Sequence, residues 1–120
     1  MTTILVIDDE LDLCETIKIF FTCRGYKMIY ALTGTGGLDA FEAERPSIVI
    51  LELFLKDMCG MDIIKRIRSK DPSCKIIVIT SSTSEKVRRQ ALKLGVSYYL
   101  SKPFSIKVLN SMILRLGWYI

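Results

Sequence analysis

Acidic, hydroxyl and lysine side chains follow four short apolar runs of this chain, at or just after the point where each run ends. The runs are residues 4–7, 48–51, 76–79 and 98–100. The polar residues that follow them are Asp8, Asp9 and Glu10, then Glu52, then Thr80 and Ser81, then Lys102. Clustered carboxylates on short loops suit a hard divalent cation such as Mg²⁺, which takes oxygen ligands. A lysine and a hydroxyl opposite them would bind an anion, for which a phosphoryl group is the obvious candidate.

Each of these residues also has an ordinary structural explanation. Paired acids after a strand often only cap the next helix, and Lys102 before Pro103 often only belongs to a turn. Their coincidence at the ends of several strands is what favours a functional site. The chain contains no histidine, which excludes Ser-His-Asp and Cys-His nucleophile systems and histidine metal sites. Any chemistry must therefore rest on carboxylates, lysines, hydroxyls and a metal ion.

These side chains can meet only if the apolar runs lie side by side. Five runs, the four above and residues 28–31, alternate with stretches of helical periodicity. Most are rich in β-branched or aromatic residues, as strands covered on both faces should be. The alternation predicts right-handed βαβ crossovers and a parallel sheet. We expect an α/β fold of the flavodoxin-like, doubly wound type, a (βα)5 three-layer sandwich with strand order 2-1-3-4-5, whose ligands bind at the carboxyl ends of the strands.

The helical stretches carry signals for their ends. Gly25 and Gly95 are expected to end the first and fourth helices, and the second helix is expected over residues 35–44. Ser82 followed by Glu85 predicts a capping box at the start of the fourth helix. The apolar residues expected to face the core from the fifth helix are Val108, Leu109, Met112, Ile113 and Leu116.

Size and composition predict one globular domain over residues 1–120, with a core in residues 3–116 and an apolar tail or the start of a linker in residues 117–120. No apolar run approaches the roughly 18 residues of a membrane helix, so we expect a cytoplasmic protein with no membrane partner. The four cysteines lack metal or disulfide spacing, which predicts reduced and mostly buried thiols. The net charge of +4 is too mild to predict that this domain binds nucleic acid.

Four segments resemble, in order and spacing, the successive signatures of the receiver domains of two-component response regulators, the CheY-like family. They are ILVIDDE at residues 4–10, VILELFLKDMCG at 49–60, IVITS at 77–81 and YYLSKPF at 98–104. The resemblance covers residues 3 to about 116. It implies that Asp8 and Asp9 bind Mg²⁺, that Thr80 orients the oxygens of a phosphoryl group, and that Lys102 is the lysine that pairs with it.

The resemblance has further implications around the last strand. Tyr99 matches the aromatic residue that rotates when the site is phosphorylated, although a tyrosine packed on a strand is an equally good explanation. The peptide bond before Pro103 is expected to be cis, in a tight turn that fixes the lysine. These roles are what the family implies for the matching positions.

The chain departs from the family at its central residue, because Glu52 stands where the family keeps its phosphate-accepting aspartate. A shift of register toward Asp57 is not favoured, since Leu55, Met58 and Gly60 hold their places in the motif. Lys56, where the family prefers proline, is a second departure, which adds a cation beside the site and loosens the turn.

The longer glutamate has two expected consequences. Its extra methylene moves the carboxylate outward, which should disturb a metal shell formed by Asp8, Asp9 and Glu52 and weaken Mg²⁺ binding, because Mg²⁺ demands near-ideal octahedral geometry. In-line phosphoryl transfer tolerates misplacement poorly, an error of about 1 Å costing on the order of 10²-fold. The carboxylate could instead reach toward Thr80 and Lys102 and imitate part of a phosphoryl group's charge.

Three hypotheses follow for the function. The first is a receiver module that does not accept phosphate and signals by binding, as a phosphorylation-independent or phosphomimetic domain. The second is a conventional phosphoacceptor in which Glu52 was engineered or reacts slowly. The third is a small Mg²⁺-dependent phosphohydrolase. The sequence shows no recognisable pair of nucleophile and base, which argues against this third hypothesis. We therefore expect that the protein is not an enzyme.

The resemblance also implies a partner surface on the fourth helix, the fifth strand and the fifth helix. Its cations are Lys86, Arg88, Arg89, Lys93, Lys107 and Arg115. They would suit an acidic patch on a sensor histidine kinase, on another signalling protein or on a second copy of the domain. A solvated, charged surface without a partner is the alternative explanation.

Overall fold

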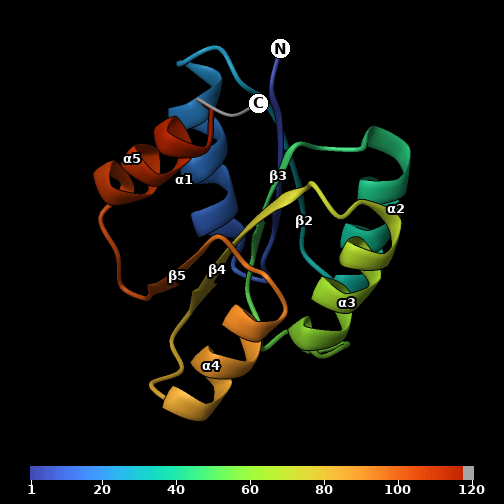
Figure 1. Ribbon diagram of the computed structural model, residues 1–120. Coiled ribbons are helices and arrows are strands. Elements are labelled where there is room, and N and C mark those ends of the chain that lie inside the picture. Colours follow the sequence, from blue (N-terminus) through green and yellow to red (C-terminus); the bar gives the residue numbers. More distant parts are fainter. Residues whose placement is uncertain (118–120) are drawn as a thin grey trace.

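The computed structural model describes residues 1–117, in which five strands alternate with five helices (Figure 1). The strands are β1 (Thr3–Ile7), β2 (Lys27–Ala31), β3 (Ile48–Leu51), β4 (Lys75–Thr80) and β5 (Tyr98–Ser101). The helices are α1 (Leu11–Thr22), α2 (Gly34–Glu44), α3 (Gly60–Lys70), α4 (Glu85–Lys93) and α5 (Ile106–Gly117). The predicted alternation of strand and helix is confirmed.

All strands pair in parallel, in the order β2-β1-β3-β4-β5. Leu5 in the central region pairs with Ile29 on one side and Val49 on the other. Helices α1 and α5 cover one face of the sheet, and α2, α3 and α4 cover the other (Figure 1). The flavodoxin-like fold and its strand order are therefore confirmed.

Both faces of the sheet are buried, which explains why the strands are apolar without a break. Leu5 and Ile7 point into the core layer under α2, α3 and α4, whereas Ile4 and Val6 point into the layer under α1 and α5. Successive side chains of a strand point to opposite faces, so a strand between two helical layers needs an apolar residue at every position. Each such aliphatic side chain contributes roughly 1.5–3 kcal/mol by its burial.

The ends of two helices agree with their glycine signals, and one helix begins differently from the prediction. Gly25 and Gly95 have φ values of +90° and +86°, which glycine adopts at no steric cost after a helix. The predicted capping box of Ser82 and Glu85 is wrong. Ser84 is the N-cap of α4, and its Oγ accepts from Val87 N at 3.2 Å. Ser82 lies two residues before this N-cap, and its Oγ accepts from Ser84 N.

Helix α5 buries a narrower stripe than predicted. Leu109, Ile113 and Leu116 are buried and Met112 is partly buried, but Val108 is 44% exposed. The buried residues recur at the i, i+4, i+7 spacing that lines one side of a helix. Val108 lies about 100° around the axis from Leu109 and turns toward solvent, so its predicted burial is wrong.

Three other predictions concern the chain as a whole. All four cysteines are free, but Cys23 and Cys59 are exposed, so only Cys14 and Cys74 agree with the expected burial. Among residues 1–117, no helix is both long and apolar enough to cross a membrane. The predicted apolar tail lies, apart from Gly117, outside the described residues.

Candidate functional site

The backbone ladder of the sheet continues one residue past the strand ends and so fixes where the polar side chains start. Glu52 N, directly after β3, donates to Ile7 O of β1 at 3.0 Å. Lys102 N, directly after β5, donates to Thr80 O of β4 at 2.8 Å. These backbone hydrogen bonds therefore fix the positions from which the side chains of Glu52 and Lys102 extend at the carboxyl edge of the sheet.

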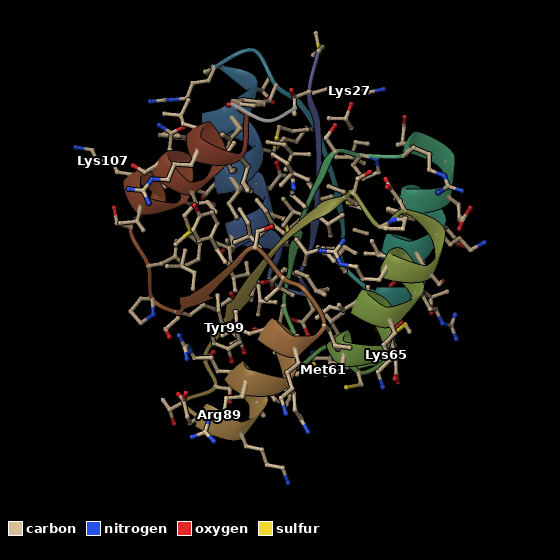
Figure 2. All side chains as sticks on the ribbon, in the orientation of Figure 1. Lys27, Met61, Lys65, Arg89, Tyr99 and Lys107 are labelled. Atoms are coloured by element: carbon tan, nitrogen blue, oxygen red, sulfur yellow. The ribbon has the colours of Figure 1, made fainter. Side chains whose placement is uncertain are left out.

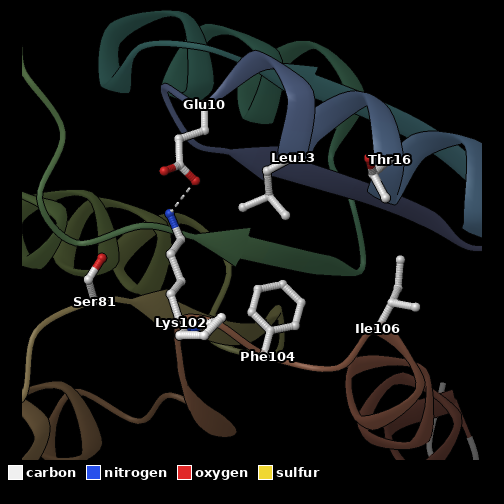
Figure 3. Close-up of a pocket in the computed structure, with 8 residues that line it drawn as sticks. Glu10, Leu13, Thr16, Ser81, Lys102, Phe104 and Ile106 are labelled. Atoms are coloured by element: carbon white, nitrogen blue, oxygen red, sulfur yellow. Dashed lines mark hydrogen bonds and ion pairs between the residues drawn. The ribbon is translucent and has the colours of Figure 1, made fainter.

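Lys102 is the centre of this edge. Its Nζ lies 2.9 Å from Asp8 Oδ2, 3.0 Å from Glu10 Oε2 and 3.1 Å from Glu52 Oε1 (the contact with Glu10 is drawn in Figure 3). Its side chain is only 12% exposed. Burial lowers the pKa of Lys102, but the three adjacent carboxylates outweigh burial and raise the pKa above its ordinary value. The lysine is therefore charged at neutral pH and shared among three acids.

Asp8 is the most deeply placed of these acids. Its residue is fully buried, and its Oδ1 accepts from Glu10 N at 2.9 Å. Its Oδ2 is near Lys102 but has no well-directed hydrogen bond from any described residue. Burial raises the pKa of Asp8, and the adjacent Lys102 ammonium offsets this only in part. Both oxygens of this buried carboxylate therefore have a neighbour, Glu10 N for Oδ1 and the Lys102 ammonium for Oδ2, and a further cation would share them.

Glu52 uses both carboxylate oxygens inside the chain. Oε1 pairs with Lys102, while Oε2 accepts from Phe54 N at 3.2 Å, and the residue is 6% exposed. The predicted reach of Glu52 toward Lys102 is confirmed. Thr80 is fully buried, and its Oγ1 accepts from Ser82 N at 3.3 Å. Between Glu52 and Thr80 the described contacts include no hydrogen bond.

The predicted metal ligands do not form a closed set around one point. Asp8 and Glu52 converge on Lys102, whereas Asp9 is half-buried and makes no ion pair with any of the described residues. Within residues 1–117, no three side chains of the Cys, Asp and Glu type are grouped so as to hold a metal ion. Magnesium binding by Asp8, Asp9 and Glu52 therefore stays a prediction.

Tyr99 extends from β5 toward the core layer on the α4 side of the sheet. Its hydroxyl is buried and finds no hydrogen-bond partner in the described part of the chain. Burial, followed by the negative charge of Glu52, raises the pKa of Tyr99. The structure places Tyr99 within electrostatic range of the site, and its role as a switch stays a prediction. The peptide bond between Lys102 and Pro103 is cis.

The structure gives two acids, Glu10 and Asp57, contacts that the sequence analysis did not predict. Glu10 was expected at the strand end but had no assigned partner, and it pairs with Lys102 across 92 residues of sequence. Asp57 was placed only in a loop. Its carboxylate accepts from Gly34 N at 2.8 Å and from Thr35 N and Oγ1 at 3.0 Å each. No local signal connects Asp57 with α2, so the sequence could not have shown this contact.

A hollow of about 500 Å³ adjoins the lysine (Figure 3). It lies between α1 and the connection from β5 to α5. The residues that line it are Glu10, Leu13, Thr16, Ser81, Lys102, Pro103, Phe104 and Ile106. Half of these are apolar, namely Leu13, Pro103, Phe104 and Ile106, while Lys102 and Glu10 form the charged end of the hollow.

The predicted surface cations divide between two neighbourhoods. Lys107 projects from α5 and Arg89 from α4 (Figure 2). Lys86, Arg89 and Lys93 line a hollow along α4, and Lys93 also lines a groove against α3. Arg88 pairs with Glu85 at 3.1 Å. Their role in binding a partner stays a prediction.

Comparison with known families gives a match to the response regulator receiver domain over residues 4–114. The transcriptional regulatory protein KdpE of Mycobacterium tuberculosis is 40% identical over 106 residues, which are 88% of this chain and 46% of KdpE. The probable transcriptional regulatory protein TcrX of the same organism is 32% identical over 95% of this chain and 47% of TcrX. The chain thus spans about half the length of these curated relatives.

Solved structures of response regulators are also similar to this chain. A two-component response regulator from Clostridium difficile superposes with a TM-score of 0.92 at 26% identity, covering 97% of this chain and 95% of that one. A response regulator receiver domain protein from Clostridium thermocellum has a TM-score of 0.87 at 28% identity, with both chains fully covered. The similarity in both sequence and structure extends through the strands that carry Asp8, Glu52, Thr80 and Lys102.

Proposed function

Because this chain belongs to the family of response regulator receiver domains, we propose that Glu52 replaces the family's phosphate-accepting aspartate and that the domain signals without being phosphorylated there. The chain is the receiver domain of a two-component response regulator. Receiver domains of this kind interact with sensor histidine kinases, and we place this one in the cytoplasm. What is specific to this chain is how Glu52 changes the site.

The ion pair of Glu52 Oε1 with Lys102 Nζ, at 3.1 Å, carries the proposal. In the family this lysine is the one that pairs with the phosphoryl group, and here a carboxylate of the chain already occupies it. Glu52 supplies one negative charge, whereas a phosphoryl group carries about −1.5 to −2 and three acceptor oxygens. The imitation is therefore partial, and it biases the domain toward its signalling conformation without equalling phosphorylation.

The position of Asp57 supports the same proposal. Both of its oxygens are held by backbone N–H groups of Gly34 and Thr35 at the start of α2. Those bonds lower the pKa of Asp57, with the bond from Gly34 having the largest effect. An acceptor must attack with a carboxylate that faces Lys102, and Asp57 is engaged elsewhere.

We further propose that Mg²⁺ binding is retained weakly, through Asp8 and Asp9. The buried Asp8 carboxylate and the half-buried Asp9, which forms no ion pair within residues 1–117, supply the oxygen ligands that a divalent cation takes, and the cation would share Asp8 with Lys102. When bound, Mg²⁺ supplies positive charge beside the carboxylates. Glu52 is the poor ligand of the set, because its carboxylate is committed to Lys102 and to Phe54 N.

For the output we propose that α4, β5 and α5 present a surface to an acidic partner, such as a sensor kinase. Apart from Lys102, which is held in the site, residues 81–117 contain six lysines and arginines and a single acid, Glu85. In a symmetric dimer through this surface, cations would face cations, which costs binding energy. An acidic signalling protein therefore fits better than a second copy, and we assign no nucleic acid to this domain.

Intact-mass spectrometry after incubation with Mg²⁺ and acetyl phosphate tests the acceptor. We expect the parent to remain unmodified and the Glu52→Asp variant to gain one phosphoryl group, because the shorter side chain restores the family's geometry. The double variant Glu52→Asp/Asp57→Asn is the matched control, and it should be modified as fully as Glu52→Asp.

A phosphorylated parent would contradict the proposal. Peptide mapping would then separate a slowly reacting Glu52 from modification at Asp57. Absence of modification in both parent and Glu52→Asp would show that Glu52 is not what prevents phosphorylation. Release of phosphate from small phosphoesters with Mg²⁺ would instead favour the hypothesis of a phosphohydrolase.

A further inference from the structure

A groove between α3 and α4 combines an apolar floor with a basic rim. Met61 and Lys65 of α3 line it together with Gln90, Lys93 and Leu94 at the end of α4. Figure 2 shows Met61 and Lys65 on the part of α3 that adjoins α4. The groove has a volume of about 280 Å³. A second hollow, of about 310 Å³, continues along α4 past Lys86 and Arg89.

Arg68 of α3 links this helix to the segments that precede β4 and follow α4. Its guanidinium donates to Cys74 O at the start of β4 and, at 2.6 Å, to Gly95 O just after α4. Because α3 carries Arg68, the second of these bonds ties α3 to the segment just after α4. Met61 and Leu94 are partly buried and pack against the core layer beneath. The floor is therefore a built surface between two helices that are held in place.

The rim carries positive charge without compensation. Lys65, Lys86 and Lys93 form no ion pair with any residue in the range 1–117, and Arg89 approaches Glu85 only at 3.7 Å. Outside the rim, Lys27 pairs with Glu44, Lys70 with Glu42, and Lys102 with Asp8, Glu10 and Glu52, each within 3.2 Å. Lys18, Lys56, Lys75 and Lys107 have no ion pair within residues 1–117, so the rim is marked by three such lysines lying together along one groove and the hollow that continues it. Carboxylates of a partner would complete the rim.

We propose that the α3–α4 groove binds an acidic amphipathic helix of a partner protein. Lys86, Gln90 and Lys93 recur at the i, i+4, i+7 spacing of one helix face, which matches carboxylates at the same spacing on the partner. An apolar side chain of the partner lies on Met61 and Leu94, where the flexible thioether of Met61 adapts to its shape. This surface is separate from Lys107 and Arg115 on α5, and the proposal does not depend on Glu52.

The chemistry of the groove favours such a helix over other anions. Its volume falls below the roughly 300–1,000 Å³ of sites for drug-sized ligands and suits a single side chain. Its rim is mostly lysine, whereas arginine is the usual choice for phosphate and nucleic-acid recognition. Neither hollow is lined by an aromatic ring on which a nucleobase could stack.

The test measures the fluorescence anisotropy of a labelled, lactam-stapled peptide helix with three glutamates at that spacing and one leucine between them. Two further probes are the same peptide with serine for leucine and a single-stranded oligonucleotide of equal charge. We expect the serine peptide to bind about tenfold more weakly than the leucine peptide, because serine cannot make the apolar contact that leucine makes with the floor of the groove. The full chain is used throughout.

Two charge-matched double variants locate the site. Lys65→Glu/Lys93→Glu should weaken binding of the leucine peptide by at least about tenfold, whereas Lys18→Glu/Arg24→Glu, at exposed positions on and just after α1 and with the same change in net charge, should weaken it by less than about twofold. Circular dichroism confirms that both variants are folded. Amide shifts in the parent should map to residues 61–66 and 86–94.

Three results would overturn the proposal. The first is equal binding of the leucine and serine peptides, or tighter binding of the oligonucleotide, which would leave only general attraction to anions. The second is equal loss in the two double variants, which would place binding outside the groove. The third is the lack of saturable binding of the leucine peptide to the parent.

Discussion

Glu52 and Asp57 are carboxylates only five positions apart on the connection from β3 to α3, and the fold uses them in opposite ways. Glu52 is 6% exposed and pairs with the side chain of Lys102, which arrives from β5. Asp57 is exposed and binds the backbone N–H groups of Gly34 and Thr35, at the start of α2. The same functional group thus faces the side-chain cation of Lys102 in one case and backbone N–H groups in the other.

The difference shows which acid holds the architecture and which remains available for function. Backbone N–H groups at a helix start need an acceptor, so removing Asp57 leaves them to water. Lys102 has three carboxylate partners, so removing Glu52 leaves it with Asp8 and Glu10. We therefore expect Asp57 to matter more for stability and Glu52 more for signalling, and four variants test this contrast.

The largest effect is expected for Lys102→Met, which leaves Asp8 and Glu52 buried together without their cation. Breaking a buried ion pair in this way costs about 3–5 kcal/mol. Urea unfolding at neutral pH measures the loss. Lys107→Met, at an exposed position of α5, is the control and should change the free energy of unfolding by less than about 0.5 kcal/mol.

The loss in Lys102→Met should depend on pH in a defined direction. Burial already raises the pKa of Asp8 in the folded protein above its ordinary 3.8, and removing Lys102 raises it further. The penalty applies only to the charged form, so it should shrink as the pH falls through the raised pKa toward 3.8 and below. A loss that stays constant across this range would show that it arises from packing instead of charge.

A smaller effect is expected for Gly60→Ala, at the start of α3, where the connection that carries both acids ends. A Cβ on Gly60 would lie 2.5 Å from the backbone Cα of Leu53, which cannot move aside cheaply. We expect a loss of about 2–3 kcal/mol in urea unfolding. Gly34→Ala is the matched variant, and it should cost less because its clash is with the flexible side chain of Met58. The reverse order would refute this explanation.

Asp57→Ala should lower the melting temperature by a few degrees, since two N–H groups of the first turn of α2 lose their acceptor. The folded pKa of Asp57 lies below its ordinary 3.8, so its contribution is complete above that value. It is lost as the pH falls through 3.8 and then through the lower folded pKa. The melting temperatures of parent and variant should therefore converge in acid, and a gap that persists there would contradict the capping role.

The smallest effect is expected for Glu52→Gln. The variant gives up one contact with Lys102 but also relieves the repulsion by which Glu52 raises the pKa of Asp8. We expect the free energy of unfolding to change by less than about 1 kcal/mol, while the pKa of Asp8, followed by carboxyl NMR, should fall. If Glu52→Gln destabilised the domain more than Asp57→Ala, the contrast between the two acids would be reversed.

The sequence by itself determined the order of strands and helices and the edge of the sheet on which the site lies. Apolar runs that alternate with helical periodicity are local patterns, and parallel strands bring their carboxyl ends to one edge whatever the details of packing. Asp8, Glu52, Thr80 and Lys102 could therefore be named from their places at or just after the ends of the strands. The glycines that end α1 and α4 were equally visible.

Only the tertiary structure decided which atoms meet. The pairing of Lys102 with Glu10, the attachment of Asp57 to α2 and the groove between Met61 and Lys93 join segments far apart in sequence, and no local pattern records them. Local errors have the same origin. Ser82 has the right spacing for a cap of α4, but the path of the chain after β4 delivers Ser84 to that place, because packing against the rest of the fold and not propensity sets where a short helix begins.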